Sequence, residues 1–379
     1  MNVLLIIPEN TGTIASVSYD LYIGLCKQAN TTVYVACLGP YVNTGFQFEN
    51  VFKLMNHGNT GALGKLYNRI HKLRKLKKEY KIELSISTLL GATYWNVLSG
   101  INDYKVGIFH TKLSQRKSAG YMTYLISYIV TRLLCKHLDK LIAVNKSAYM
   151  DLKGIFKTKD IELVYNIHNF SNISSKASLP LTDKREIELF KNNVILYVGG
   201  LYHNIKGTDR LIKAFAKIKS YAPNLKLVYI GEDTDHSLPL LLKTIQEFSL
   251  QEDVFFLGKK SNPYQYMKQS LMLVSPSRDE GLPGVLIEAL SLGLKCVATN
   301  SSEGIWEIMQ CDNDYNPHLS VIKQTLFGYI TPNLINNETF TIDCLAEAIR
   351  KCLNTEFHII ENFNTNRFSA ESIISHYLP

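Results

Sequence analysis

The feature that most constrains this chain is the stretch of residues 274–300, which reads as one strand–loop–helix–strand unit. Residues 271–274 form an apolar run of strand length, and a polar loop follows over residues 275–283. A helix with a glycine end and a second short strand at residues 296–298 come next. In open α/β sheets, the helix that follows such a strand begins where ligands bind, and its positive end favours an anion.

Two carboxylates belong to this unit, Glu280 on the loop and Glu288 in the helix. Taken alone the pair is weak evidence, because acidic residues near a helix start commonly complement the helix dipole. Their setting is more specific, with Ser-Pro-Ser before the first carboxylate and Gly-Leu-Pro-Gly after it. The whole run resembles the donor-binding segment of the retaining glycosyltransferases of family 4, which have the GT-B fold. The resemblance implies that Glu280 faces the donor sugar and that Glu288 accepts hydrogen bonds from ribose.

The strand–helix alternation of this unit recurs along the 379 residues, a length that suits two α/β domains. With the resemblance, it predicts two Rossmann-like doubly wound domains facing across a cleft. We expect an acceptor-binding domain over residues 1–170, joined by a terminal helix over 365–379. A nucleotide-sugar-binding domain covers residues 171–364. The polar run from Asn169 to Pro180 suits a hinge between them.

A second motif runs from Gly199 to Gly207 and resembles the family motif G-R-L-x-x-x-x-K-G, whose Arg and Lys hold the donor diphosphate. Lys206 occupies the lysine position, but Gly200 stands where the family has arginine. One charge-assisted phosphate contact is therefore missing. Backbone N–H groups, another cation such as Arg278, or a different donor geometry would have to compensate.

Backbone groups at the start of the central helix complete the expected donor site: Gly281, Leu282, Gly284 and Val285. Two residues of the first domain are also expected there. Gly12 lies in a turn-rich loop after the first strand, although a lone glycine is equally compatible with a simple turn. His110 directly follows the strand at residues 106–109, and the resembled family places a catalytic histidine facing the donor sugar at this position.

Charge is divided unevenly, since residues 1–183 carry a net charge of +11 and the remainder −3. Much of it lies between Lys65 and Lys78, where leucine and isoleucine recur at helical spacing among seven cations. This amphipathic basic helix is either a solvated face on a packed helix or a site for an anionic membrane or a pyrophosphate-bearing acceptor. No aromatic–basic interleaving accompanies it, so nucleic acid is not an expected partner. Residues 121–134 predict a core helix or an interfacial one, flanked by Arg116, Lys117 and Lys136.

We expect no metal and no cofactor, because the nucleotide-sugar is a substrate and the seven cysteines form no C-x-x-C pair. Asp233-Thr234-Asp235 matches the D-x-D of metal-dependent glycosyltransferases, but it follows a strand at a turn where acidic loops are ordinary. The amino-terminal apolar run has strand length and no charged leader, which predicts a cytoplasmic protein. The basic helix between Lys65 and Lys78 adds the hypothesis that it is peripheral on the inner face of the cytoplasmic membrane.

The resemblance implies a retaining, metal-independent hexosyltransferase for bacterial surface polysaccharide. It would move a hexose or N-acetylhexosamine from a nucleotide-sugar, expected to be a UDP-sugar, to a glycan or lipid-linked acceptor. Two other classes stay open. One is another GT-B enzyme, such as an epimerase or a phosphorolytic enzyme. The other is a nonenzymatic protein that binds membranes or nucleic acid through its basic helix.

Overall fold

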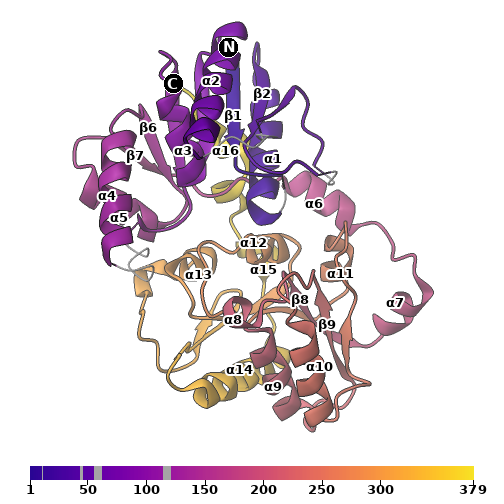
Figure 1. Cartoon of the computed structure of the whole chain (residues 1–379). Helices are drawn as coiled ribbons and strands as arrows, with labels where there is room; N and C mark the ends of the chain where they lie inside the picture. The colour runs from indigo at the N-terminus through magenta and orange to yellow at the C-terminus, as the bar shows by residue number, and fades with distance from the viewer. Residues whose placement is uncertain (11, 43–45, 55–61, 114–120) are drawn as a thin grey trace. The chain divides into compact units, whose positions relative to one another are not determined.

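A computed structural model describes residues 1–10, 12–42, 46–54, 62–113 and 121–379 of the chain, apart from some side chains next to these gaps (Figure 1). The chain divides into two compact units. The first unit comprises Met1–Asn169 and Asn366–Pro379, and the second comprises Phe170–Thr365. These limits lie one residue from those expected from the sequence.

The first unit is built on a seven-stranded parallel sheet with the order β3-β2-β1-β4-β5-β6-β7. Its strands are β1 (Asn2–Ile7), β2 (Thr32–Cys37), β3 (Val51–Lys53), β4 (Leu84–Thr88), β5 (Tyr104–Phe109), β6 (Lys140–Ala143) and β7 (Asp160–Leu163). The order reverses between β1 and β4, which is the doubly wound arrangement that the alternation predicts.

Helices cover both faces of this sheet because alternate residues of each strand point to opposite faces. Val3 and Leu5 join one core cluster with α1 (Gly12–Cys26), whereas Leu4 and Ile6 join another with α2 (Ala62–Glu79). The unit also contains α3 (Leu89–Leu98), α4 (Tyr121–Cys135) and α5 (Lys146–Ile155). Burial on both faces explains why the strands read as continuous apolar runs.

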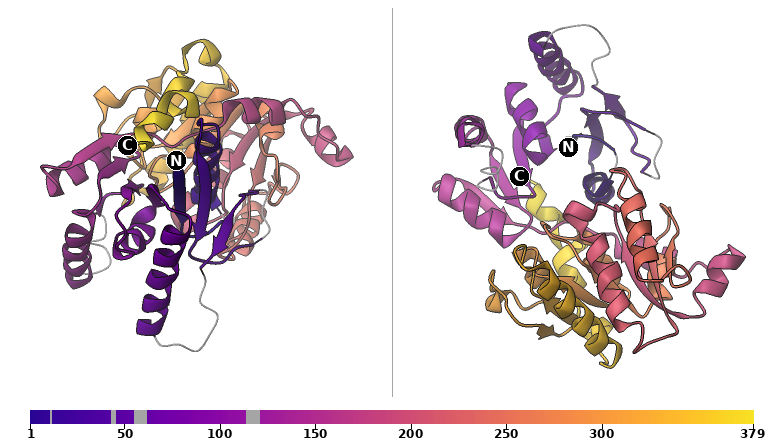
Figure 2. Two further views of the ribbon diagram at one scale, coloured as in Figure 1. Left: turned by 90° about the horizontal axis from the view of Figure 1, so that it is seen from above. Right: turned by 60° about the horizontal axis from the view of Figure 1, so that its bottom comes forward.

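The carboxyl-terminal segment of the chain packs in the first unit, so both termini lie there (Figures 1 and 2). It forms η3 (Thr365–Phe368), α16 (Ala370–Ile373) and η4 (Ile374–Tyr377). A Cβ atom placed on Gly24 of α1 would lie 3.2 Å from side-chain atoms of Ala370 and Ile374. The helix surface at Gly24 is therefore flat enough for the terminal segment to lie directly on it.

The second unit repeats the design around the sheet β10-β9-β8-β11-β12-β14-β13, in which only β13 runs antiparallel to its neighbour. Its strands are β8 (Asn193–Val198), β9 (Leu225–Ile230), β10 (Val254–Phe256), β11 (Met272–Ser275), β12 (Lys295–Thr299), β13 (Lys323–Thr325) and β14 (Gly328–Thr331). Its helices are α6 (Phe170–Ala177), α7 (Lys184–Leu189), α8 (His203–Lys206), α9 (Thr208–Ile218), α10 (Leu238–Glu247), α11 (Tyr264–Lys268), α12 (Gly284–Ser291), α13 (Glu303–Ile308), η2 (Asp312–Asp314), α14 (Glu338–Leu353) and α15 (Ile359–Asn362). The prediction of two Rossmann-like doubly wound domains is confirmed.

Most of the polar run that suited a hinge forms the helix α6. Ile173 and Ala177 are both buried and lie four positions apart, so they fall on one helical face. Two well-placed apolar residues outweigh the polar composition of the segment. The boundary between the two units falls at its start, between Asn169 and Phe170, and a hinge there stays a prediction.

The basic helix is present as α2, but its cations do not share one solvated face. Lys72, Lys75 and Lys78 are exposed. Arg74 donates a hydrogen bond to the Ser99 carbonyl oxygen at 2.8 Å, and the Lys77 side chain is fully buried. The side chain of Lys65 lies outside the described residues. A solvated face on a packed helix, one of the two alternatives, thus accounts for only part of these cations, because the inner side of the helix includes lysine as well as leucine.

Lys77 instead belongs to a buried polar cluster under α2. Its Nζ atom lies 2.8 Å from Asp103 Oδ2 and donates to Asn96 Oδ1 at 2.6 Å. Lys105 Nζ lies 2.9 Å from the other Asp103 oxygen. Burial lowers the pKa of Lys77 to about 8, against the opposing charge of Asp103. A buried ammonium is tolerated here because Asp103 carries the opposite charge and Asn96 accepts a hydrogen bond, although the charge of Lys105 opposes it.

Replacing Asp103 by Asn should lower the free energy of unfolding by roughly 3–5 kcal/mol, because it leaves the Lys77 ammonium buried beside a neutral amide. Urea unfolding followed by circular dichroism measures this. The control is Glu347→Gln, which breaks the half-exposed pair with Arg350 and should change stability by less than about 1 kcal/mol. Equal effects of the two substitutions would contradict the assignment.

Candidate active site

The candidate site lies at the carboxyl ends of β8 and β11, where the strand order of the second sheet reverses. These strands pair with each other, but the chain continues to β9 on one side and to β12 on the other. The loops after β8 and β11 therefore diverge and leave a crevice, which is where open α/β sheets bind ligands. Lys206 follows β8 and Glu280 follows β11, so both predicted residues come from the two loops at this point.

The structure joins these two residues in an ion pair, with 2.8 Å between Lys206 Nζ and Glu280 Oε1. Ser277 Oγ donates a second hydrogen bond to the same oxygen at 2.7 Å. The Glu280 side chain is 11% exposed. Its other oxygen, Oε2, accepts no hydrogen bond from any described residue. One oxygen of the carboxylate is thus fixed, and the other is available to a ligand.

Gly207 allows the two loops to approach this closely. It adopts a left-handed conformation, with φ of +62°. A Cβ atom at this position would lie 2.2 Å from the carbonyl oxygen of Pro276, on the loop after β11. Any side chain would push apart the loops that carry Lys206 and Glu280.

Gly200 is found where a side chain would meet the ring of Tyr202. A Cβ atom at position 200 would lie 2.5 Å from Tyr202 Cε2. The ring is held by a hydrogen bond of 2.6 Å from Thr234 Oγ1 to its hydroxyl. An arginine at position 200 would have to displace this ring. The position of Tyr202 therefore explains in steric terms why glycine stands where the family motif has arginine.

Arg278, one of the alternatives left by the sequence, is engaged in ion pairs of its own. Its guanidinium group lies 3.1 Å from Asp209 and 2.5 Å from Glu338. Although burial opposes the effect, the neighbouring Arg278 lowers the pKa of Asp209. Arg210 also binds Glu338, with its Nε atom 2.7 Å from Oε1. Both arginines are neutralised by carboxylates behind the loops.

The backbone at the start of α12 supplies the remaining predicted groups. The carbonyl oxygen of Gly281 accepts a hydrogen bond of 2.9 Å from Ser302 Oγ, which anchors the loop. None of four amides donates a hydrogen bond to another described residue: Gly281, Leu282, Gly284 and Val285. Unpaired amides in a first helical turn carry partial positive charge and can bind an anion.

Glu288 lies in α12 and is half-buried. Its Oε1 atom accepts a hydrogen bond of 3.4 Å from the hydroxyl of Tyr264, the first residue of α11. The sequence analysis missed Tyr264, and it also missed Ser277 and Tyr202. Ser277 lies within the Ser-Pro-Ser run that was noted before Glu280, whereas nothing in the local sequence distinguishes Tyr264 or Tyr202.

The other two predicted residues, His110 and Gly12, belong to the first unit and are described within it. His110 directly follows β5 at the carboxyl edge of its sheet, and its carbonyl oxygen accepts from Asn145 Nδ2 at 3.3 Å. The Nε2 atom is buried and has no hydrogen-bond partner among the described residues. Burial lowers the pKa of His110 to about 4, so the ring is neutral near pH 7. Gly12 begins α1 with φ of +71° and open space around its Cα.

The D-x-D sequence caps a helix. Asp233 Oδ1 and Asp235 Oδ1 accept from the Ser237 amide at 2.7 and 3.2 Å, directly before α10. Among the described residues, no group of three or more His, Cys, Asp and Glu side chains could hold a metal ion. The ordinary acidic turn is thus the role that the geometry supports for this motif.

Comparison with known proteins is informative at this point. Residues 182–315, within the second unit, match the family model of glycosyl transferases group 1. An uncharacterized glycosyltransferase of Methanocaldococcus jannaschii is 27% identical over 296 residues, which cover 73% of this chain and 70% of that protein.

Two relatives with named activities or pathways match over shorter stretches. The N-acetylgalactosamine-N,N'-diacetylbacillosaminyl-diphospho-undecaprenol 4-alpha-N-acetylgalactosaminyltransferase of Campylobacter jejuni is 33% identical over 190 residues, 50% of this chain and 48% of the relative. A capsular polysaccharide biosynthesis glycosyltransferase of Staphylococcus aureus is 28% identical over 168 residues, 44% of each chain. The matched segments span about half the length of these two relatives or less.

Solved structures match over nearly the whole chain. Sucrose-phosphate synthase from Thermosynechococcus elongatus has a TM-score of 0.69 at 16% identity, covering 99% of this chain and 98% of that one. Anabaena HepE in complex with UDP and glucose has a TM-score of 0.69 at 17% identity, covering 98% and 97%. The chain therefore has the GT-B fold. Lys206 and Glu280 both lie inside the segment of the second unit that matches the family model of glycosyl transferases group 1.

Gly207→Ala should lower the free energy of unfolding by about 2 kcal/mol more than Gly258→Ala, as measured by urea unfolding. Both glycines have a positive φ, +62° and +68°, but a Cβ atom at Gly258 meets nothing within 4 Å. The difference isolates the clash with Pro276 from the backbone strain. If the two variants were equally stable, the loops would not be in the close contact described.

The free energy of unfolding should fall as the pH is lowered from about 7 to 5. The pKa of His110 is about 4 in the folded chain and near 6.5 in the unfolded one, so the unfolded chain binds a proton first. We expect a contribution of roughly 1–2 kcal/mol, which His110→Gln should remove in urea unfolding at the two pH values. His168, whose pKa burial also lowers to about 4, would keep its own contribution.

The control for this measurement is His318→Gln, at an exposed position. It should leave the pH dependence unchanged. An unaltered pH dependence in His110→Gln would show that the His110 ring is hydrated in the folded protein.

Proposed function

We propose that this protein is a retaining glycosyltransferase of family 4 that works without a metal ion. It transfers a hexosyl or N-acetylhexosaminyl group from a nucleotide-sugar to a hydroxyl of a glycan or lipid-linked acceptor. The observation that carries the proposal is the Lys206–Glu280 pair at the switch point of the second sheet, next to four unpaired amides. The group 1 domain match and the GT-B fold support the same class.

The leaving diphosphate is the part of the reaction that these residues suit best. As the bond between the anomeric carbon and the phosphate oxygen breaks, negative charge develops on the diphosphate. Lys206 and the amides at the start of α12 would stabilise that charge through preorganised hydrogen bonds. Lys206, Arg278 and Arg210 are all paired with carboxylates, so the unpaired amides at the start of α12 are the groups that would add positive potential without first leaving a protein partner.

Glu280 and His110 are proposed to bind the donor sugar. Glu280 Oε2 would accept hydrogen bonds from sugar hydroxyls and oppose the positive charge that develops at the anomeric carbon. His110 is neutral near pH 7, so its buried Nε2 can form a hydrogen bond with a sugar hydroxyl without adding charge. Glu288, held by Tyr264, would accept from the ribose hydroxyls.

Retention would follow from a displacement on the same face of the sugar. The acceptor hydroxyl forms its bond to the anomeric carbon as the phosphate leaves, and the departing phosphate oxygen takes the hydroxyl proton. This route needs no protein nucleophile, and we assign it because Glu280 is already held by Lys206 and Ser277.

The named relatives and neighbours support the proposed substrate classes. HepE was solved with UDP and glucose, which favours a UDP-sugar as the donor. The Campylobacter relative acts, by its name, on a diphospho-undecaprenol-linked glycan, and the Staphylococcus relative belongs to capsular polysaccharide biosynthesis. We propose a bacterial surface polysaccharide as the product and the inner face of the cytoplasmic membrane as the place of work. Gly12 and Gly200 remain proposed donor contacts.

The test is thermal-shift binding of UDP-, GDP- and ADP-sugars, followed by transfer assays with the sugar that binds. A ligand that binds only the folded chain raises its melting temperature with concentration. We expect Lys206→Met and Glu280→Gln each to lower kcat/KM by about 100-fold or more. Lys217→Met, which breaks the surface pair with Asp343, should leave kcat/KM unchanged.

The outcomes separate the alternatives. If no nucleotide-sugar raised the melting temperature, the proposed donor site would be wrong. Release of an epimer or a sugar phosphate without transfer would assign another GT-B chemistry. A nonenzymatic role would follow if the chain bound membranes or nucleic acid in a salt-sensitive way without a nucleotide. In that case Lys206→Met and Glu280→Gln would leave the binding unchanged.

A further inference from the structure

Helix α4 of the first unit has an apolar face on its solvent side. Its inner side packs toward α3, where Tyr94 Oη and Thr131 Oγ1 lie 2.5 Å apart, and Cys135 is fully buried. Three large aliphatic side chains are nevertheless well exposed: Ile126 at 58%, Ile129 at 47% and Leu133 at 54%. Spacings of three and four residues place them on one stripe of the helix. A surface helix normally has charged or polar residues there.

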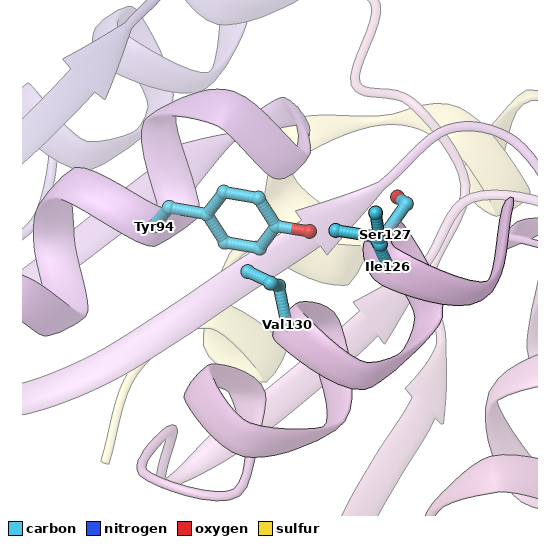
Figure 3. Close-up of a pocket in the computed structure, with 4 residues that line it drawn as sticks. All are labelled: Tyr94, Ile126, Ser127 and Val130. Carbon is cyan, nitrogen blue, oxygen red and sulfur yellow. The ribbon is translucent and has the colours of Figure 1, made fainter. Parts of the chain in front are cut away.

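A recess adjoins this stripe and extends the apolar surface. It has a volume of about 340 Å³ and is lined by Tyr94, Ile126, Ser127 and Val130. Figure 3 shows the side chains of these residues, Tyr94 from α3 and the others from α4, gathered around it. The hydroxyl of Tyr94 is already bonded to Thr131, so the recess offers a largely apolar wall.

The charges around the stripe are basic. Arg132 and Lys136, at the end of α4, are exposed, and residues 121–138 contain no Asp or Glu. The two carboxylates closest in the sequence are engaged elsewhere. Asp139 Oδ2 accepts from the Lys105 amide at 2.7 Å, and Asp151 Oδ2 accepts from the Leu113 amide at 2.7 Å. Arg116 and Lys117, which the sequence places before this helix, lie outside the described residues.

We propose that the outward face of α4 attaches the chain to an anionic lipid bilayer. Ile126, Ile129 and Leu133 enter the interfacial layer, while Arg132 and Lys136 bind lipid phosphate groups. With 15 residues, α4 is shorter than the roughly 20 that span a bilayer, so in this proposal it lies along the surface. Among the described residues, no helix is both long and apolar enough to span a membrane. This inference uses the first unit alone and does not rest on the transferase chemistry.

Charge favours a bilayer over a second copy of this chain. Across a two-fold interface centred on α4, Arg132 and Lys136 would face the same cations of the partner, and no carboxylate of the helix would neutralise them. Three aliphatic side chains are also few beside the roughly 20–30 residues that each partner contributes to a stable interface. An anionic surface satisfies both the cations and the apolar stripe.

In this proposal α2 contributes less to membrane binding than α4, although its basic sequence first indicated a membrane contact. Its exposed cations are Lys72, Lys75, Lys78 and Arg74, which is hydrogen-bonded to Ser99, but its described apolar residues other than Tyr67 are buried or half-buried. It can add attraction at a distance, whereas α4 combines charge with side chains that can enter the interface.

The experiment is co-sedimentation of the full chain with vesicles of phosphatidylcholine, with and without phosphatidylglycerol. The wild type should bind the anionic vesicles. The triple variant Ile126→Gln/Ile129→Gln/Leu133→Gln should lower the partition coefficient by about ten-fold or more. The matched control is Leu240→Gln/Leu242→Gln, at two exposed leucines of α10 that are 43% and 51% exposed, and it should bind like the wild type.

Substitutions of the cations on each helix test whether α4 or α2 binds the vesicles. Arg132→Gln/Lys136→Gln should lower binding to anionic vesicles by roughly 30-fold, and Lys72→Gln/Lys75→Gln/Lys78→Gln should have a smaller effect. Wild-type binding to anionic vesicles that survives the α4 triple substitution would overturn the proposal, and so would an α2 variant that abolishes it. No wild-type binding, with a dimer in sedimentation velocity that the α4 variant dissociates, would assign the face to a second copy instead.

An unchanged melting temperature of each variant shows that it is folded, independently of any donor. The vesicle result and the nucleotide-sugar result can therefore fail separately.

Discussion

The ion pair between Lys206 and Glu280 connects the two loops that diverge at the switch point of the second sheet. Its geometry depends on the sheet, because β8 and β11 are adjacent strands whose connections leave in opposite directions. It depends equally on Gly207, since only a residue without Cβ lets the first loop meet the Pro276 carbonyl group. Ser277 then fixes one oxygen of the carboxylate. The result is a polar edge that is assembled before any ligand arrives.

The distribution of cations around this edge explains how the site can differ from the family motif. Arg210 and Arg278 share Glu338, and Arg278 also pairs with Asp209, so this network holds α9, the β11 loop and α14 together. Those arginines are structural. Position 200 cannot supply a further cation, because Tyr202 occupies the space next to it. The electrostatics of the site consequently rest on one lysine and on backbone amides.

The first unit shows why net charge is a poor guide to a binding surface. Lys77 lies in the most basic stretch of the chain, yet its side chain is fully buried against Asp103. The helix α4 has few charges, yet its outward face is the more unusual one, because aliphatic side chains lie where a solvated helix has polar ones. Where a side chain points decides its role, and composition does not carry that information.

Residue patterns predicted the alternation of strands and helices, and the resemblance to family 4 added the two-domain arrangement and the roles of Lys206 and Glu280. The patterns predicted the alternation because strand length, helical spacing and glycine ends reflect local backbone geometry. They did not indicate the helix α6 within residues 169–180, where polar composition concealed its buried face. They also missed Ser277, Tyr202 and Tyr264 as partners. Only the tertiary structure decided that Arg278 is neutralised, that Lys77 is buried and that α4 is apolar outside, because each depends on contacts between residues far apart in the chain.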